Sequence, residues 1–257
     1  MSYETLQITH EESHAVVTLN RPPANAISEQ LVKDLNTALD ELEQDPAVLS
    51  VIITGAGEKI FCAGADLGSA FSGGEVERFI KFGNTVLRRI ERFPKPVIAA
   101  INGHAMGGGC EIAMACHLRV MKETARIGQT ESNLGILPGY GGTQRLPRLI
   151  GRTKALEFLI LGTQMPAAEA HQLGLVNRLS REGETLDDAK AMARLIAKRA
   201  PLATRLIIQA VDDGLNAAID QGLEAETRAF LATLRTEDAA EGIQAFFQKR
   251  EATFKGR

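Results

Sequence analysis

The order of apolar and polar residues divides the first part of the chain into short apolar runs separated by amphipathic stretches. The apolar runs, which are typical of buried strands, are residues 14–19, 48–54, 97–101 and 118–121. Residues 29–42 and 75–93 repeat apolar side chains at spacings of three and four, which predicts helices. This rhythm recurs about every 45 residues and indicates an α/β fold. Periodicity alone leaves open a doubly wound sheet or a coiled stack of similar units.

After residue 152 the pattern becomes almost wholly helical. Only residues 175–179 have the pattern of another strand. A composition shift predicts a core of residues 1–200 followed by a helical region of residues 201–257. The predicted helices, which all carry apolar residues three and four positions apart, are 153–161, 167–173, 185–199, 202–213, 216–233 and 237–252.

Composition limits the classes of function. The 257 residues are 44% hydrophobic and 24% charged, and the formal net charge of −3 indicates no basic surface for nucleic acid. The three cysteines form no Cys-x-x-Cys pair, so we expect reduced thiols and a cytoplasmic location. The N-terminus lacks the features of a leader peptide, and no apolar run reaches the roughly 18 residues that span a membrane. We therefore expect neither a nucleic-acid nor a membrane partner.

Three consecutive glycines, residues 107–109, lie between the predicted strand 97–101 and an apolar stretch typical of a helix. Without side chains, they allow the backbone to turn tightly and to approach a ligand closely. The first amides of the following helix would be unpaired and could bind an anion or a polarised oxygen. Glu111 lies about one helical turn further on. The junction therefore places amide donors beside a carboxylate.

A second glycine-rich loop, residues 134–143, follows a second candidate acid, Glu131. Either glutamate alone is more often a cap or an ion-pair partner, whereas the two glycine loops beside them favour catalysis. Neither a Gly-x-Ser-x-Gly elbow, a phosphate-binding P-loop nor a His-Glu-x-x-His zinc motif is present, and Ile60 stands where a dinucleotide fingerprint needs its third glycine. The histidines, too far apart in sequence to suggest a metal site, are His10, His14, His104, His117 and His171.

Three motifs in this order resemble the crotonase superfamily, the enoyl-CoA hydratase/isomerase family. They are residues 61–67 (Phe-Cys-Ala-Gly-Ala-Asp-Leu), 102–111 (Asn-Gly-His-Ala-Met-Gly-Gly-Gly-Cys-Glu) and 134–148. The similarity continues to residues 246–250 and covers essentially the whole chain. The resemblance implies a spiral of repeated ββα units with a helical C-terminal region that forms trimers or dimers of trimers. It favours the coiled stack over the doubly wound sheet.

The resemblance also implies an active site. The backbone amides of Ala65 and Gly108 would bind the thioester oxygen of an acyl-CoA, as an oxyanion hole. Glu111 would activate the water that attacks C3 of a trans-2-enoyl-CoA, and Glu131 would exchange the proton at C2. Gly139 matches a loop position close to the water. Relatives with one glutamate tend to be isomerases or decarboxylases, so the pair favours a hydratase that acts in fatty-acid or related acyl-CoA metabolism.

Coenzyme A enters as part of the substrate, and the resemblance implies no other cofactor and no metal. Positions that match its contacts are Ala24, Ala63, Asp66 and Leu67 in this subunit, and Phe246 and Lys249, which would reach the CoA of a neighbouring subunit. Three departures concern the support of the site. The segment around Pro23 lacks the phosphate-facing lysine of many hydratases, so that only Arg21 is near, while His117 and Thr130 replace the usual Asp and Pro.

Two other functions stay open from the sequence. A Δ3,Δ2-enoyl-CoA isomerase, or a hydratase for a branched or cyclic acyl-CoA, would share these motifs. Some relatives bind RNA, but the net charge of −3 and the lack of a basic block count against that function.

Overall fold

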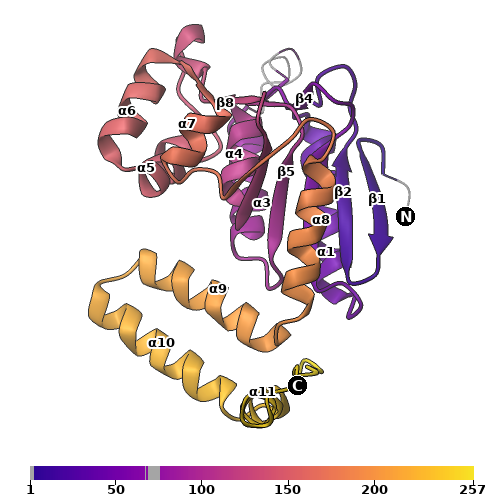
Figure 1. The fold of residues 1–257 in the computed structure, drawn as a ribbon. Coiled ribbons are helices and arrows are strands. Elements are labelled where there is room, and N and C mark those ends of the chain that lie inside the picture. Colours follow the sequence, from indigo (N-terminus) through magenta and orange to yellow (C-terminus); the bar gives the residue numbers. More distant parts are fainter. Residues whose placement is uncertain (1–2, 67, 69–75) are drawn as a thin grey trace.

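A computed structural model describes residues 3–66, 68 and 76–257 (Figure 1). The larger of its two sheets has the strand order β1-β2-β3-β5-β7-β10. The first two strands pair antiparallel, and every other neighbouring pair is parallel. The bounds of these strands are β1 Leu6–Glu11, β2 His14–Leu19, β3 Ser50–Gly55, β5 Val97–Ile101, β7 Leu118–Lys122 and β10 Arg178–Ser180.

The smaller sheet has the order β4-β6-β8-β9, and its last strand is antiparallel to its neighbour. Its strands are β4 Ile60–Cys62, β6 His104–Met106, β8 Arg126–Gly128 and β9 Gln164–Pro166. Strands β3, β5 and β7 of the large sheet are each followed along the chain by a strand of the small sheet and then by a helix. This repetition of ββα units is the coiled stack, and it excludes the doubly wound sheet.

Helices cover both faces of the large sheet. Alternate residues of the strands, such as Val17, Ile53 and Ala99, belong to the larger core cluster, which includes buried residues of α1 (Glu29–Gln44), α3 (Val76–Glu91) and α4 (Gly108–Ala115). The intervening residues, such as Ile52 and Ile98, pack on the other face against α8 (Thr185–Ala197). Burial on both faces explains why these strands are continuous apolar runs.

Helix α4 carries the glycine junction at its start, and all its residues are buried. Arg119, a buried residue of β7, donates to Ala113 O at 3.2 Å and to Cys116 O at 2.5 Å. The guanidinium thus satisfies carbonyls that the end of the helix leaves unpaired. The C-terminal end of this short helix is consequently held in place inside the core.

The pattern missed several elements and shifted another. Strands β4, β6, β8 and β9 each span only three residues, which is too short for a periodic signal. The strand expected at residues 175–179 lies at Arg178–Ser180, because the amides of Leu175 and Val176 donate to Ala170 O and form a turn. The remaining helical segments that the structure describes before residue 200 are η1 Glu131–Leu134, α5 Gly142–Ile150, α6 Arg152–Leu161 and α7 Ala167–Gln172, of which α5 was not predicted.

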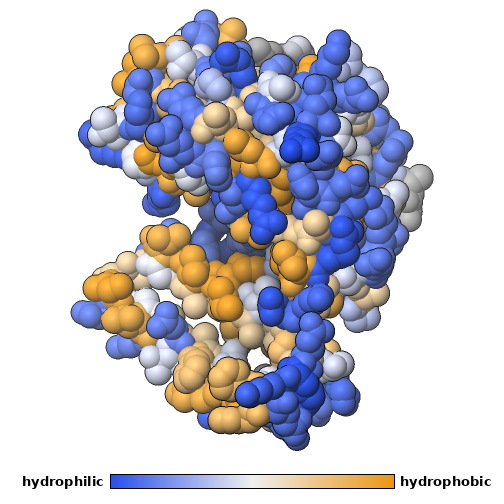
Figure 2. Space-filling model, viewed as in Figure 1, coloured by the Kyte–Doolittle hydropathy of each residue, from blue (hydrophilic) through white to orange (hydrophobic). Residues whose placement is uncertain are grey.

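The last three helices, α9 (Pro201–Leu215), α10 (Ile219–Thr233) and α11 (Glu237–Gln248), project away from the sheets (Figure 1). Neither α9 nor α10 contains a fully buried residue. An ion pair between Arg88 of α3 and Asp212 of α9, with distances of 2.8 and 2.9 Å, connects them to the core. Figure 2 shows hydrophobic side chains gathered over this region, and those exposed on it include Ile207, Val211, Leu215, Ile219, Leu223, Phe230, Leu231 and Phe246.

Candidate active site

The glycine junction, residues 107–109, follows β5 and β6 and forms the start of α4. Asn102, just after β5, accepts from Gly55 N at 3.0 Å and donates to Gly55 O at 2.8 Å, which ties the ends of β5 and β3 together. Gly107 has a φ of +51° and donates to Gly128 O at 2.8 Å. A positive φ is accessible to glycine at little cost, so the chain can turn here and begin α4 at once.

The amides of Ala65 and Gly108 converge on one space. A side chain at position 64 would place its Cβ 3.4 Å from Gly108 N, and one at position 108 would place its Cβ 3.5 Å from Ala65 N. Ile27 bonds to the residues on either side of Ala65, since its N–H donates to Gly64 O and its carbonyl accepts from Asp66 N. Within the described residues, neither the Ala65 nor the Gly108 amide has an acceptor. Two adjacent free donors of this kind can stabilise a developing oxyanion.

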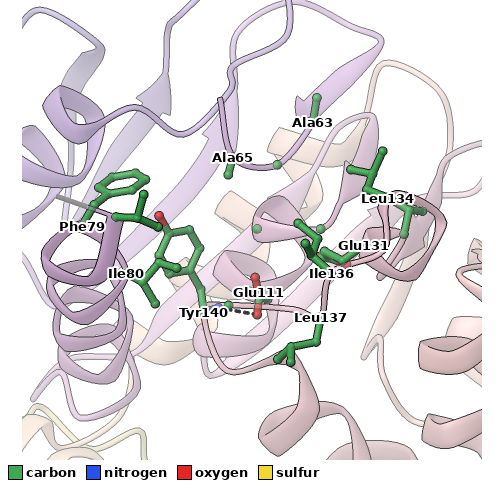
Figure 3. Close-up of a pocket in the computed structure, with 16 residues that line it drawn as sticks. Ala63, Ala65, Phe79, Ile80, Glu111, Glu131, Leu134, Ile136, Leu137 and Tyr140 are labelled. Carbon is green, nitrogen blue, oxygen red and sulfur yellow. Dashed lines mark hydrogen bonds between the residues drawn. The ribbon is translucent and has the colours of Figure 1, made fainter. Parts of the chain in front are cut away.

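Glu111 is only 1% exposed, and its carboxylate lies under the second glycine loop. One oxygen accepts from Tyr140 N at 2.8 Å (Figure 3) and from Gly142 N at 2.7 Å. Burial raises the pKa of Glu111 to about 7, and the nearby Glu131 also raises it, although the two amide bonds oppose the shift. A carboxyl that titrates near neutral pH can act as both a base and an acid.

Glu131 is the first residue of the short helix η1, and its carboxylate lies beside Gly107. A Cβ at position 107 would be 2.9 Å from Glu131 Oε1, so the glycine leaves room for the carboxylate. In the amide orientation that satisfies both groups, the buried Gln129 donates to the two carboxylate oxygens at 3.0 and 3.1 Å. Burial raises the pKa of Glu131 as well. Two neighbouring acids with raised pKa values are typical of a site that moves protons.

The stability of the protein should depend on the charge of Glu111. Its folded pKa of about 7 exceeds the ordinary value of 4.5, so the folded state binds this proton more tightly than the unfolded state. The contribution of this group is therefore most favourable below pH 4.5 and is lost as the pH rises through 7. Glu111→Gln removes the titration, and its stability relative to wild type should increase by about 2 kcal/mol between pH 5 and pH 8. Urea unfolding of both proteins at these pH values measures the change, and a constant difference would contradict it.

One pocket of about 140 Å³ contains both acids and both amide donors. Figure 3 shows the two acids between apolar side chains, with Phe79, Ile80 and Tyr140 on one side and Leu134, Ile136 and Leu137 on the other. Thr130 also lines the pocket, and its side chain makes no cap bond to η1. The other lining residues are Ala63, Gly64, Val76, Phe79, Ile80, Gly107, Leu134, Ile136, Leu137, Gly139 and Tyr140.

Several supporting side chains carried no recognisable signal in the sequence. Asn84 of α3 donates to Gly139 O at 2.7 Å and so holds the loop position expected near the water. Arg145 of α5 donates to Tyr140 O at 2.7 Å and also pairs with Glu91 at 3.1 Å. These side chains fix the loop whose amides bind Glu111, but their partners are distant in the sequence.

His117, one of the departures from the family pattern, has a structural role. Its Nδ1 accepts from Val97 N at 2.8 Å, and its Nε2 lies 3.1 Å from Glu91 O. Burial lowers the pKa of His117, which favours the neutral ring that this pair of contacts requires. The imidazole therefore joins the start of β5 to the end of α3.

The residues predicted to contact CoA are only partly collected at the pocket. Ala63 lines it and donates its amide to Ala24 O at 3.0 Å, while Asp66 pairs with Arg21 at 2.6 Å. Leu67 lies outside the described residues. The two C-terminal positions are Phe246 in α11 and Lys249 directly after it. Figure 1 shows α11 well away from α4. Their contact with the CoA of a neighbouring subunit stays a prediction.

The sequence pattern of the enoyl-CoA hydratase/isomerase family matches residues 9–257, and the chain therefore belongs to this family. It is 43% identical to the short-chain-enoyl-CoA hydratase of Clostridium acetobutylicum over the whole of both chains. It is 42% identical to the crotonyl-CoA hydratase of Syntrophomonas wolfei over 99% of each. The crystal structure of the Bacillus anthracis enoyl-CoA hydratase superposes with a TM-score of 0.95 at 38% identity, over 99% of this chain and 100% of that one.

These findings confirm the predicted family, the crotonase-type fold with a helical C-terminal region and an enzyme of this class. In the part of the chain that the structure describes, no helix is long and apolar enough to cross a membrane.

Proposed function

We propose that this enzyme reversibly hydrates short trans-2-enoyl-CoA thioesters to 3-hydroxyacyl-CoA, in fatty-acid β-oxidation or a related acyl-CoA pathway. One observation carries the proposal: Glu111 and Glu131 line the same pocket as the free amides of Ala65 and Gly108. The names of the relatives from Clostridium acetobutylicum and Syntrophomonas wolfei support the same reaction.

In this mechanism the thioester oxygen accepts hydrogen bonds from Ala65 N and Gly108 N. The two donors withdraw electron density from the double bond and stabilise the enolate that forms when C3 is attacked. The Glu111 carboxylate removes one proton from water as the water oxygen bonds to C3. Protonated Glu131 then supplies the proton that C2 receives. A proton passing from Glu111 to Glu131 restores the starting state, so that water is added with no other reactant.

The two carboxylates also separate this function from isomerisation. Moving a double bond from C3 to C2 needs one group to carry a proton between C4 and C2, and no water is consumed. Glu111, with its pKa raised to about 7, is the second acid that hydration requires and isomerisation does not. We therefore propose hydration as the main reaction.

A substrate panel tests the proposed reaction. Crotonyl-CoA, a branched analogue, a cyclic analogue and 3-butenoyl-CoA are each incubated with the enzyme, and the products are separated by chromatography. We expect 3-hydroxybutyryl-CoA from crotonyl-CoA at the highest rate. Isomerisation of 3-butenoyl-CoA without hydration would select the isomerase, and tight binding of RNA with no turnover would overturn the enzyme assignment for this site.

The partner that best fits the C-terminal helices is a second and third copy of this chain, as a trimer or a dimer of trimers. Helices α9 and α10 have no fully buried residue, while several of their large apolar side chains are exposed. Such a surface on an isolated chain favours association. Light scattering after size-exclusion chromatography should give three or six times the 27.7 kDa mass of the chain, and a monomer at micromolar concentration would contradict this assembly.

A further inference from the structure

Tyr140 joins the proposed catalytic acid to the wall of the pocket. Its N–H donates to Glu111 and its carbonyl accepts from Arg145, so the backbone of this residue is fixed from both sides. The side chain lines the pocket and is only 4% exposed. The position of the ring is therefore set by the same loop that holds Glu111.

The ring lies against helix α3, where a glycine leaves space for it. A Cβ on Gly83 would lie 2.3 Å from Tyr140 Cε1, so the ring occupies the space of a side chain at that position. Phe79, one turn earlier in α3, meets the ring edge to face with 5.8 Å between the centroids. The two rings form a continuous aromatic surface on this side of the pocket (Figure 3).

The same ring is close to the reacting group. A Cβ on Gly108 would be 3.4 Å from Tyr140 Cδ2, which places the ring edge beside one of the two oxyanion donors. The acyl chain starts at the carbon that carries the thioester oxygen, so its first carbons would lie next to this ring. The pocket of about 140 Å³ is small compared with the roughly 300–1,000 Å³ of drug-sized ligand sites.

We propose that Tyr140, backed by Phe79, is the wall that limits the acyl pocket to short chains of about four to six carbons. This inference rests on the proposed hydratase function. The rings exclude further methylenes by volume, since the packed ring cannot move toward Gly83 or Gly108 without a clash. The hydroxyl of Tyr140 has no partner among the described residues, so the ring and not a hydrogen bond forms the barrier.

Chain-length profiles test the role of this wall. The values of kcat/KM for trans-2-enoyl-CoA substrates of four, six, eight and ten carbons are compared between wild type, Tyr140→Ala and Tyr140→Phe. In Tyr140→Ala the ratio of the eight-carbon to the four-carbon value should rise about tenfold or more, because the methylenes enter the vacated space. Tyr140→Phe keeps the ring and should keep the wild-type ratio.

Phe79→Leu is a second variant that leaves the backbone contacts of Tyr140 with Glu111 untouched. It should shift the ratio in the same direction by a smaller factor, even if Tyr140→Ala folds poorly. The role of the wall would be overturned by an unchanged ratio in folded variants that still hydrate crotonyl-CoA. A wild type that already prefers eight or ten carbons would overturn it too, and both results would leave the proposed hydratase function standing. A wild type that hydrates no enoyl-CoA would overturn the proposed function, and this inference with it.

Discussion

Replacing Glu131 with glutamine is expected to lower kcat for crotonyl-CoA hydration by about 10²- to 10⁴-fold, with little change in the fold. The amide cannot supply the proton that C2 receives. It can still be accommodated, because the Gln129 amide that faces it can turn and offer its oxygen to the new NH₂ group. Glu111→Gln should cause a loss of similar size, because the amide cannot remove a proton from water. The loop should stay in place, since the amide oxygen can still accept from Tyr140 N and Gly142 N. Initial rates at saturating crotonyl-CoA measure both effects.

The matched control is Glu157→Gln, which changes the same functional group on the exposed side of α6. It should retain wild-type kcat, and circular dichroism should show all three variants folded. If either pocket variant kept more than a tenth of the wild-type kcat, the assigned proton transfer would be wrong for that residue.

Adding one methyl group at Gly108 is expected to lower kcat/KM by about 10²- to 10³-fold. The new Cβ would lie 3.5 Å from Ala65 N and next to Gly108 N, in the space that the thioester oxygen must occupy. The backbone of the oxyanion hole would remain, but the substrate oxygen could no longer reach both donors. Steady-state kinetics of Gly108→Ala with crotonyl-CoA checks this effect.

A second variant separates this blockage from simple crowding. The same Cβ would lie 2.6 Å from Ile27 Cδ1, so Gly108→Ala also strains the packing. Ile27→Val removes that methyl group and should restore the melting temperature of the double variant without restoring its activity. Recovery of activity together with stability would show that crowding, not loss of the donor pair, caused the defect.

The parts of the site that could be predicted from the sequence are those contained in short segments. The glycine junction and Glu111 lie within one strand-to-helix connection, so their proximity follows from local geometry alone. Glu131 could be named from its motif, but its position across Gly107 depends on the pairing of β6 with β8. The resemblance to the family supplied that long-range information.

The supporting side chains could not be predicted because their roles arise only after packing. Asn84 and Gly139 are 55 positions apart, and nothing in the sequence near either residue indicates the bond between them. Arg145 and Tyr140 are close in sequence, yet their contact requires α5 to begin at Gly142, inside a segment that appeared to be a loop. The short strands of the small sheet were missed for a related reason, since three residues are too few for a periodic pattern.

In the proposed mechanism, two carboxylates and two backbone amides form one site that adds water to an enoyl thioester. The most direct test is the product formed from crotonyl-CoA by wild type, Glu111→Gln and Glu131→Gln, identified and quantified by chromatography and mass spectrometry. We expect 3-hydroxybutyryl-CoA from wild type and at most about a hundredth of that rate from each variant. Absence of this product from folded wild-type enzyme, or undiminished formation by both variants, would contradict it.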